Sequence, residues 1–261
     1  MSFQTEAKVI KNVEVAKKYY KILLSCPKIS WSAEPGQFVE VKVSARDEPL
    51  LRRPFSIHRV KGQDIEILYA VVGTGTEILS RKESGEYLDI IGPLGNGFDY
   101  RTPEHHNSKT SLLVLGGIGV APLVFLAEKL KGQKTLVLIG AKTKAGILCE
   151  KAFKELGCAV KISTDDGSRG FHGKVTELLQ HVLKPSTYNL ALTIYACGPH
   201  PMLKEVSKIS QKYNIPAQVS LEEHMACGIG ACLGCVVKTS QGYQRVCKEG
   251  PVFKAHEIIW E

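Results

Sequence analysis

Residues 112–127 read LLVLGGIGVAPLVFLA, and this stretch decides the fold of the middle of the chain. An apolar run enters a glycine turn at residues 116–119, and Pro122 opens a second apolar run. A buried strand, a glycine turn and a helix in this order are typical of dinucleotide sites, because glycines let backbone and ligand approach closely. The turn lacks the G-x-G-x-x-G fingerprint, so an ordinary strand–helix turn stays an alternative. The candidate ligand-binding residues are Gly116, Gly117, Gly119, Ala121 and Pro122.

The same strand–helix alternation extends over residues 110–215. Nearly continuous apolar strands are predicted at 111–115, 135–140, 159–164 and 192–197, and helices at 120–131, 148–156, 174–182 and 199–212. Such strands are expected where helices cover both faces of a parallel sheet, so we predict a doubly wound nucleotide domain. The last strand ends in CGPHPM (197–202), which would face the same crevice as the glycine turn. From this segment we select Cys197, Gly198, Pro199 and Met202, although an isolated cysteine is more often a small buried apolar residue.

Residues 1–104 read as an all-β domain. Alternating segments recur at 5–15, 19–25, 37–43, 54–60, 64–71 and 86–91, with turn signals between them, which predicts a small antiparallel barrel or sandwich. A helix is expected over Glu77–Lys82 with Thr76 as its cap. The polar stretch 100–110 (YRTPEHHNSKT) is predicted to be a linker, and its two histidines to be solvated.

Two motifs in the all-β domain have ligand-binding chemistry. In RRPFS (52–56), an arginine can clamp a pyrophosphate, the aromatic ring can lie against a flat ring, and the serine can bond a ring nitrogen. In YAVVGTGT (69–76), a strand runs into a glycine turn whose amides favour phosphate. Each motif alone also fits an ordinary turn. The candidates are Arg53, Pro54, Phe55, Ser56, Tyr69, Ala70, Val71, Val72, Gly73, Gly75 and Thr76.

Four of the eight cysteines lie within the last 35 residues, in the spacing C-x4-C-x2-C-x11-C. The first three follow the plant-type [2Fe–2S] spacing, and glycines between them allow a loop to wrap a cluster. A hairpin over 236–246 would bring the fourth thiol back. A structural zinc site and free thiols are the alternatives, although zinc sites usually pair two C-x2-C knuckles. The candidate metal ligands, in a small unit over 216–261, are Cys227, Cys232, Cys235 and Cys247.

Composition excludes several classes of function. The 261-residue chain is 44% apolar with a formal charge of +8, but its Lys and Arg residues are scattered, so nothing marks a nucleic-acid surface. The longest apolar stretch, 112–127, is too short and too broken to span a bilayer. Residues 1–10 lack a secretory h-region, so we expect a cytoplasmic protein. In a cytosolic chain, eight cysteines should not form a disulfide framework. No Ser/His/Asp or paired-carboxylate constellation presents a catalytic residue.

Taken together, these motifs resemble the ferredoxin–NADP⁺ reductase superfamily. The runs EHMACGIGACLGC (223–235) and CKEGPVF (247–253) narrow the resemblance, over the whole chain, to electron-transfer subunits of class 1B, NAD-dependent dihydroorotate dehydrogenases. The resemblance implies an α/β plus all-β chain: an FAD-binding antiparallel barrel (1–104), an NAD-binding domain (110–215) and a [2Fe–2S] domain (216–261). Phe55 stands where the superfamily commonly has tyrosine, so one hydrogen bond to the flavin side is absent.

The resemblance also implies an activity and a partner. A flavin must stand between a two-electron nicotinamide and a one-electron cluster. Electrons would run from an FMN-containing dihydroorotate dehydrogenase catalytic subunit through the cluster and FAD to NAD⁺, in pyrimidine biosynthesis and in a heterotetramer with two copies of each subunit. Residues 221–261 would contribute to the interface, and Leu233 is either an exposed apolar contact there or a side chain that packs over the cluster. Alternatives are an NAD(P)H-oxidising subunit of another reductase and a redox sensor. Lys142 and Lys144 leave NADP open, whereas Asp165 and Asp166 favour NAD.

Overall fold

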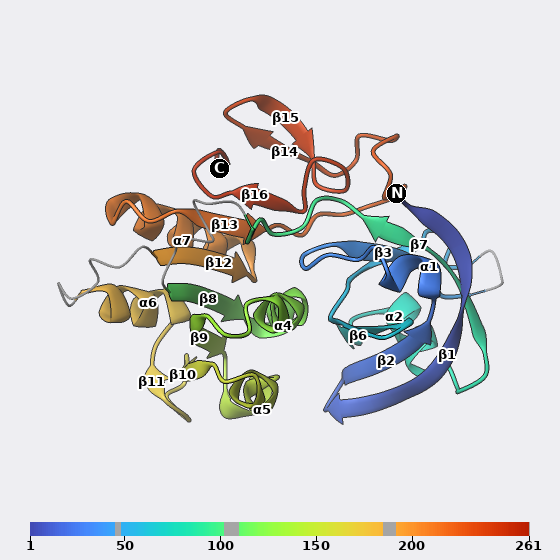
Figure 1. Cartoon of the computed structure of the whole chain (residues 1–261), viewed down its shortest axis with the longest axis horizontal. Helices are drawn as coiled ribbons and strands as arrows, with labels where there is room; N and C mark the ends of the chain where they lie inside the picture. Colours follow the sequence, from blue (N-terminus) through green and yellow to red (C-terminus); the bar gives the residue numbers. More distant parts are fainter. Residues whose placement is uncertain (45–47, 102–109, 185–191, 261) are drawn as a thin grey trace.

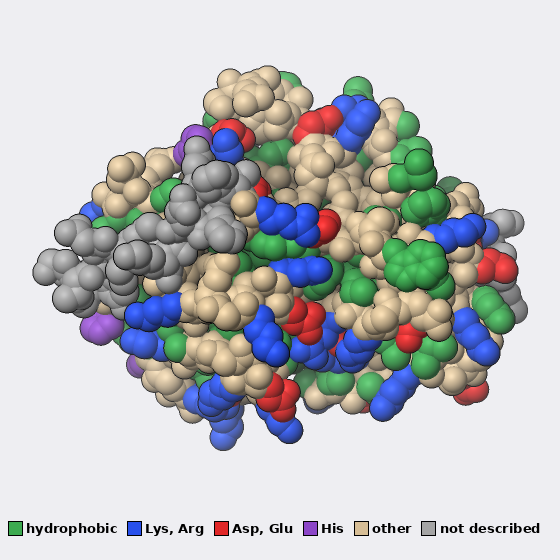
Figure 2. Space-filling model, in the orientation of Figure 1, with side chains coloured by type: hydrophobic (Ala, Val, Ile, Leu, Met, Phe, Trp, Pro, Cys, Tyr) green, Lys and Arg blue, Asp and Glu red, His purple; other side chains and the backbone are tan. Residues whose placement is uncertain are grey.

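The computed structural model describes residues 1–44, 48–101, 110–184 and 192–260, which form two seven-stranded sheets and one hairpin (Figure 1). Residues 102–109, most of the predicted linker including its histidines, lie outside the described residues. Within the described ranges, no helix combines the length and the apolar character needed to cross a membrane. On the face seen in Figure 2, basic side chains lie scattered among acidic, polar and apolar ones.

The first sheet is antiparallel throughout and has the order β4-β3-β7-β1-β2-β6-β5. It closes on itself far enough for β4 to contact β6, and alternate side chains fill its interior, among them Ile22, Val39 and Ile67. The predicted antiparallel barrel is confirmed. Its strands are β1 (Phe3–Ala16), β2 (Tyr19–Ser25), β3 (Phe38–Lys42), β4 (Arg53–Ser56), β5 (Arg59–Lys61), β6 (Asp64–Ala70) and β7 (Tyr87–Leu94), with helices α1 (Pro27–Ser30) and α2 (Thr74–Ser80).

Two local predictions in this sheet were wrong. The single strand expected over 54–60 is split into β4 and β5, because the chain turns where the Ile57 and His58 amides donate to the carbonyl oxygens of Gln37 and Glu66. Helix α2 begins at Thr74, so Thr76 lies inside it instead of capping it. The Thr76 hydroxyl accepts hydrogen bonds from the amides of Val72 and Gly73, which tightens the turn entering the helix.

The second sheet has the order β11-β10-β9-β8-β12-β13-β16, and every pair except β13–β16 is parallel. Helices α4 and α5 pack together on one face, and α6 and α7 on the other (Figure 1). The predicted doubly wound sheet is confirmed. Its elements are β8 (Thr110–Gly116), η1 (Gly117–Gly119), α4 (Val120–Lys129), β9 (Lys134–Ala141), η2 (Lys144–Gly146), α5 (Glu150–Glu155), β10 (Ala159–Thr164), β11 (Phe171–His172), α6 (Val175–Leu183), β12 (Leu192–Cys197), α7 (His200–Lys212), β13 (Ala217–Ser220) and β16 (Val252–Lys254).

The C-terminal segment leaves this sheet and returns to it. After β13 come the cysteine loop and the hairpin β14 (Val236–Thr239) and β15 (Gly242–Arg245); β16 then pairs antiparallel with β13. The Leu221 amide donates to the Pro251 carbonyl at 2.8 Å, closing the base of the excursion. The second sheet thus contains two strands, β13 and β16, that lie beyond residue 216, the predicted start of the third domain. The domain limits stay a prediction.

Candidate functional site

The two motifs of the barrel meet at the start of helix α2. The side chain of Arg53, on β4, lies directly over Gly75, where an added Cβ would be 2.8 Å from Arg53 Nε. Residue 75 is therefore restricted to glycine as long as the guanidinium stays there. Of the neighbouring candidates, Gly75 and Thr76 are buried, Gly73 and Val72 are exposed, and Pro54, Ser56, Ala70 and Val71 are partly exposed. A guanidinium and a group of amides at one place form a site suited to an anion.

The aromatic ring of this site is part of the barrel core. Phe55 is only 9% exposed and packs edge-on against Tyr69, with ring centroids 5.6 Å apart. The Tyr69 hydroxyl donates to Asn12 Oδ1 at 3.1 Å, and burial raises the pKa of Tyr69, so it remains a neutral phenol. Phe55 and Tyr69, selected from separate motifs, therefore lie in contact.

The two motifs of the parallel sheet also touch each other. β8 and β12 are neighbours, so the glycine turn after β8 and the CGPHPM segment after β12 emerge at the same edge. A Cβ on Gly116 would lie 2.6 Å from Met202 Sδ, and one on Gly119 would lie 2.3 Å from the Cys197 carbonyl oxygen. Gly117 has φ +56° and open space beside it, so its backbone is free to receive a ligand. Gly198 and Pro199 complete this contact, and Ala121 and Pro122 lie buried in the first turn of α4.

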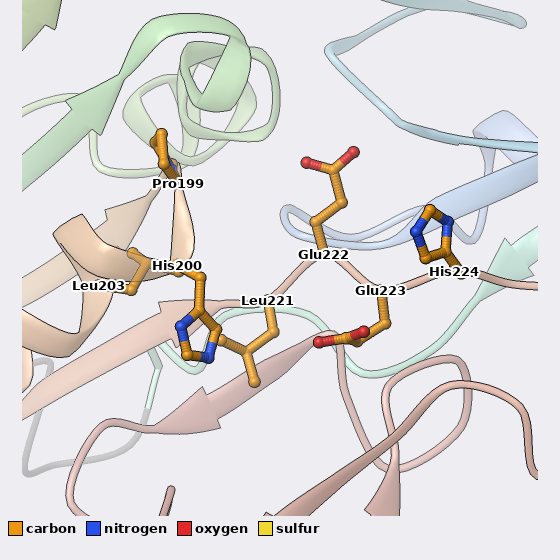
Figure 3. Close-up of a pocket in the computed structure, with 8 residues that line it drawn as sticks. Pro199, His200, Leu203, Leu221, Glu222, Glu223 and His224 are labelled. Carbon is orange, nitrogen blue, oxygen red and sulfur yellow. The ribbon is translucent and has the colours of Figure 1, made fainter. Parts of the chain in front are cut away.

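A hollow of about 290 Å³ extends from this contact toward the cysteine loop. Gly198, Pro199 and His200 line one side, and residues 221–224 line the other. The side chains of Glu222 and Glu223 point in opposite directions (Figure 3), so their two carboxylates lie on opposite sides of this segment. The hollow joins the predicted nucleotide motif to the chain segment that leads into the cysteines.

The loops that follow β9 and β10 also lie together. The Asp166 amide donates to the Lys142 carbonyl, and the Lys144 amide donates to Ser168 Oγ at 2.8 Å. The Asp166 carboxylate accepts from the amide and the hydroxyl of Ser168, and these bonds lower the pKa of Asp166. Lys142 and Lys144, which left NADP open in the sequence, and Asp166, which favoured NAD, therefore lie at one edge of the sheet.

The four clustered cysteines come together as two pairs. The Cys232 amide donates to Cys227 Sγ at 3.4 Å, and the Cys247 amide donates to Cys235 Sγ at 3.4 Å. Among the described residues, no three His, Cys, Asp or Glu side chains converge on one point as a single metal ion requires. Four thiols in two pairs can supply the two thiolates that each iron of a binuclear cluster takes.

The surroundings of Cys227 favour the thiolate form of its side chain. Burial would raise the pKa of Cys227, but backbone amides of Cys232, Ile229 and Ala231 point at the sulfur and lower the pKa to about 6. Cys247 lies deeper, where burial and the neighbouring Cys235 thiol raise its pKa to about 12. Backbone amides directed at sulfur are the surroundings that an anionic iron–sulfur centre requires.

A buried carboxylate under the loop was not found from the sequence. Glu40 on β3 is fully buried, and neither of its carboxylate oxygens has a hydrogen-bond partner. Burial raises its pKa to about 7, against the opposing influence of Arg52. In the stretch QFVEVKV, Glu40 alternates with valines, which is the pattern of a solvent-facing position. The sequence pattern therefore did not indicate that Glu40 is buried. The cysteine loop folds over this face of β3 and buries it.

The comparisons with known proteins agree with this geometry. A family model described as the iron-sulfur cluster binding domain of dihydroorotate dehydrogenase B matches residues 222–259. The chain is 43% identical, over 100% of both chains, to a protein of Desulforamulus reducens named dihydroorotate dehydrogenase B (NAD(+)), electron transfer subunit. A protein of that name from Clostridium acetobutylicum is also 43% identical, over 98% of this chain and 97% of its own length.

Solved structures show the same fold. The NADH-dependent reduced ferredoxin-NADP oxidoreductase, described in connection with flavin-based electron bifurcation, matches 100% of this chain and 92% of its own with a TM-score of 0.86 at 30% identity. A ferredoxin NADP⁺ reductase from Neisseria gonorrhoeae with bound FAD and NADP matches 80% of this chain and 91% of its own, with a TM-score of 0.67 at 16% identity. The second likeness concerns the fold alone.

Proposed function

Because the chain belongs to the family of electron-transfer subunits of dihydroorotate dehydrogenase B (NAD(+)), we propose that it passes electrons from a catalytic partner subunit to NAD⁺ through a [2Fe–2S] cluster and FAD. The observation that carries the proposal is the pairing of four thiols in a loop directly beside a flavin-reductase fold. The finer points, namely an FMN-containing partner, two copies of each subunit and a cytoplasmic location, belong to this proposal.

In this proposal, Cys227 and Cys232 would hold one iron, and Cys235 and Cys247 would hold the other. The amides that already point at Cys227 and Cys235 stabilise negative charge on these sulfurs. Cys232 is exposed whereas Cys235 and Cys247 are buried, so one side of the centre would face a partner and the other side the protein interior.

For FAD, Arg53 would bind the pyrophosphate, together with the amides of the turn that contains Gly73, Gly75 and Thr76. Phe55 would lie against the flavin ring, Ser56 would bond a ring nitrogen, and the strand from Tyr69 to Val72 would support the ribityl side. When bound, FAD exchanges an electron pair with a nicotinamide and single electrons with an iron–sulfur centre. The close contact of Arg53 with Gly75 supports this assignment, since it joins both motifs at one anion-binding point.

For NAD⁺, the glycine turn at Gly116, Gly117 and Gly119 would accept the pyrophosphate, with Ala121 and Pro122 starting the helix behind it. Cys197, Gly198, Pro199 and Met202 would line the nicotinamide side of the crevice. The open space at Gly117 and the hollow beside Pro199 support this assignment. The residues need only align the nicotinamide, because hydride transfer requires no general base.

The exposed side chains of the cysteine loop support a partner at this face. Ile229 is 55% and Leu233 is 60% exposed, on either side of Cys232. Apolar side chains around a redox centre exclude water when a partner covers them. The catalytic subunit would therefore dock on the loop, with the remainder of 221–261 contributing to the contact.

The test is to co-express the chain anaerobically with its catalytic partner and to titrate the purified complex with NADH, recording the visible spectrum and EPR. We expect bleaching of a flavin and a rhombic signal of a reduced [2Fe–2S] centre, and an FMN protein that supplies electrons from dihydroorotate. Cys235→Ser should abolish the rhombic signal, whereas Cys158→Ser, which changes a buried cysteine outside the loop, should leave it intact. Zinc in place of iron would overturn the proposal.

One observation favours a second candidate, a flavin and iron–sulfur subunit that serves another reductase. The likeness to the NADH-dependent reduced ferredoxin-NADP oxidoreductase extends over the whole chain at 30% identity. The titration separates the two candidates, because only the first predicts that dihydroorotate reduces the cofactors of the complex.

A further inference from the structure

The buried side chain of His58 connects the end of β4 to the start of helix α4. His58 lies two residues beyond Ser56, where the chain turns out of β4, and it is fully buried. Its Nδ1 lies 2.7 Å from the carbonyl oxygen of Ala121, in the first turn of α4. A carbonyl oxygen can only accept, so His58 Nδ1 carries the proton and donates it. The bond spans 63 positions of sequence and joins the two cofactor motifs directly.

The rest of the His58 side chain makes no competing hydrogen bond. Nε2 lies 3.7 Å from Glu66 Oε1 and has no hydrogen-bond partner. Glu66 is engaged by Lys61, whose Nζ donates to Glu66 Oε2 at 2.7 Å. The bond to Ala121 is thus the one directional interaction that fixes this ring.

Among the described residues, helix α4 also packs against β5 and β6 of the barrel, and the glycine turn η1 packs against β6. Phe125 packs into the barrel core, and Arg59 Nε lies 2.8 Å from Glu128 Oε1. Phe125 and Glu128 lie beyond the first turn of the helix, whereas the hydrogen bond from His58 reaches Ala121 within that turn. The hydrogen bond from His58 therefore ties the turn that follows β4 to the residues directly after the glycine turn.

We propose that His58 is a positioning residue, which holds the glycine turn of residues 116–119 in register with the flavin strand so that a bound nicotinamide meets the flavin ring. The inference rests on the proposed function, because it requires NAD⁺ at the turn and FAD at β4. Hydride transfer needs the reacting atoms about 3–3.5 Å apart, and a shift of about 1 Å costs on the order of 100-fold in rate. A hydrogen bond between the two motifs is a direct means of setting that distance.

Two polar variants of similar size separate this role from general packing. The side-chain amide nitrogen of Asn can occupy the place of His Nδ1, whereas that of Gln extends toward the place of Nε2. His58→Asn should keep the bond to Ala121, and His58→Gln should lose it. Arg59→Gln is the matched control, because it breaks a second polar contact between the barrel and α4 without touching the glycine turn.

The experiment uses the complete complex and measures flavin bleaching by saturating NADH in a stopped-flow instrument. We expect His58→Gln to slow bleaching by about 10- to 100-fold with NAD⁺ affinity changed by less than about threefold, and His58→Asn to recover most of the loss. Arg59→Gln should stay within about threefold of the unmodified complex. A second readout, independent of turnover, is amide hydrogen exchange at residues 117–121, which should accelerate in His58→Gln alone.

The outcomes are distinguishable from failure of the proposed function. If the unmodified complex is not bleached by NADH, the proposed function itself is wrong. If it is bleached and His58→Gln matches it, or if His58→Gln and His58→Asn lose rate equally, the positioning role is wrong. Equal losses in His58→Gln and Arg59→Gln would also overturn it, since general docking of α4 would then explain both.

Discussion

Glu40 packs directly beneath Gly228, so closely that a Cβ on Gly228 would lie 2.4 Å from Glu40 Cγ. Gly228 also has φ +67°, a conformation that costs other residues about 1–2 kcal/mol. We therefore expect Gly228→Ala to lift the cysteine loop from β3 and to lower bound iron and sulfide by more than about twofold. The matched control is Gly234→Ala, where the nearest atom, Cys232 Sγ, is 3.5 Å from the new Cβ. Equal iron content in both variants would contradict the prediction.

The same buried carboxylate predicts a dependence of stability on pH. Burial raises the pKa of Glu40 from 4.5 to about 7, so between these values the folded state binds a proton that the unfolded chain has released. Stability is therefore lost as pH rises through this window. Glu40→Gln cannot ionise, and we expect it to gain about 2 kcal/mol relative to the unmodified chain between about pH 5.5 and pH 8.

The measurement for Glu40 is the apparent melting temperature of the two chains across that pH range. The gap should be smallest at the acid end and should reach a few degrees at the alkaline end. Glu83→Gln, which alters an exposed glutamate, should follow the unmodified chain at every pH. A gap that stays constant with pH would show that Glu40 acts through packing alone.

His58 predicts the opposite trend on the acid side. Burial, reinforced by Lys21, lowers its pKa from 6.5 to about 4. Between these pH values the unfolded chain therefore binds a proton that the folded state does not bind. Stability should fall as pH drops below 6.5, by about 2 kcal/mol on reaching about pH 5. His58→Asn removes this titration, and its melting temperature should fall less steeply over the same interval. Parallel curves for the two chains would contradict the lowered pKa.

Leu233 offers a test of the partner surface that leaves the cluster in place. It has φ +57°, and asparagine adopts this left-handed conformation more readily than leucine does. Leu233→Asn should keep bound iron unchanged but weaken association with the catalytic subunit by about tenfold, because an exposed apolar contact is lost. Dissociation constants from calorimetry would check this. Val15→Thr, at an apolar side chain on β1 that is 45% exposed, should leave association unchanged.

The parts of the site that follow from local sequence were predictable. Cysteine spacing, glycine turns and apolar periodicity report on residues that are neighbours along the chain, so the cluster loop, the parallel strands and the hairpin at 236–245 could be located in advance. The comparisons confirm the fold, the family and the cofactor classes that these motifs predicted.

The parts that depend on packing between distant segments were not predictable. Glu40 becomes buried only because residue 228 folds over it, and His58 finds its acceptor at Ala121 across the domain interface. The break between β4 and β5 has the same origin, since Gln37 and Glu66 supply the carbonyl groups that turn the chain. A pattern read along one segment contains no information on such partners.

The return of β16 to β13 has a consequence for protein engineering. β13 lies one strand in from the end of its sheet only because β16 covers it; all four of its residues are buried. A chain cut at residue 221 to isolate a cluster-free reductase would expose this strand as an unprotected edge, ready to pair with other chains. The cluster segment is therefore not a detachable module, and a truncation intended to simplify the protein should yield aggregates.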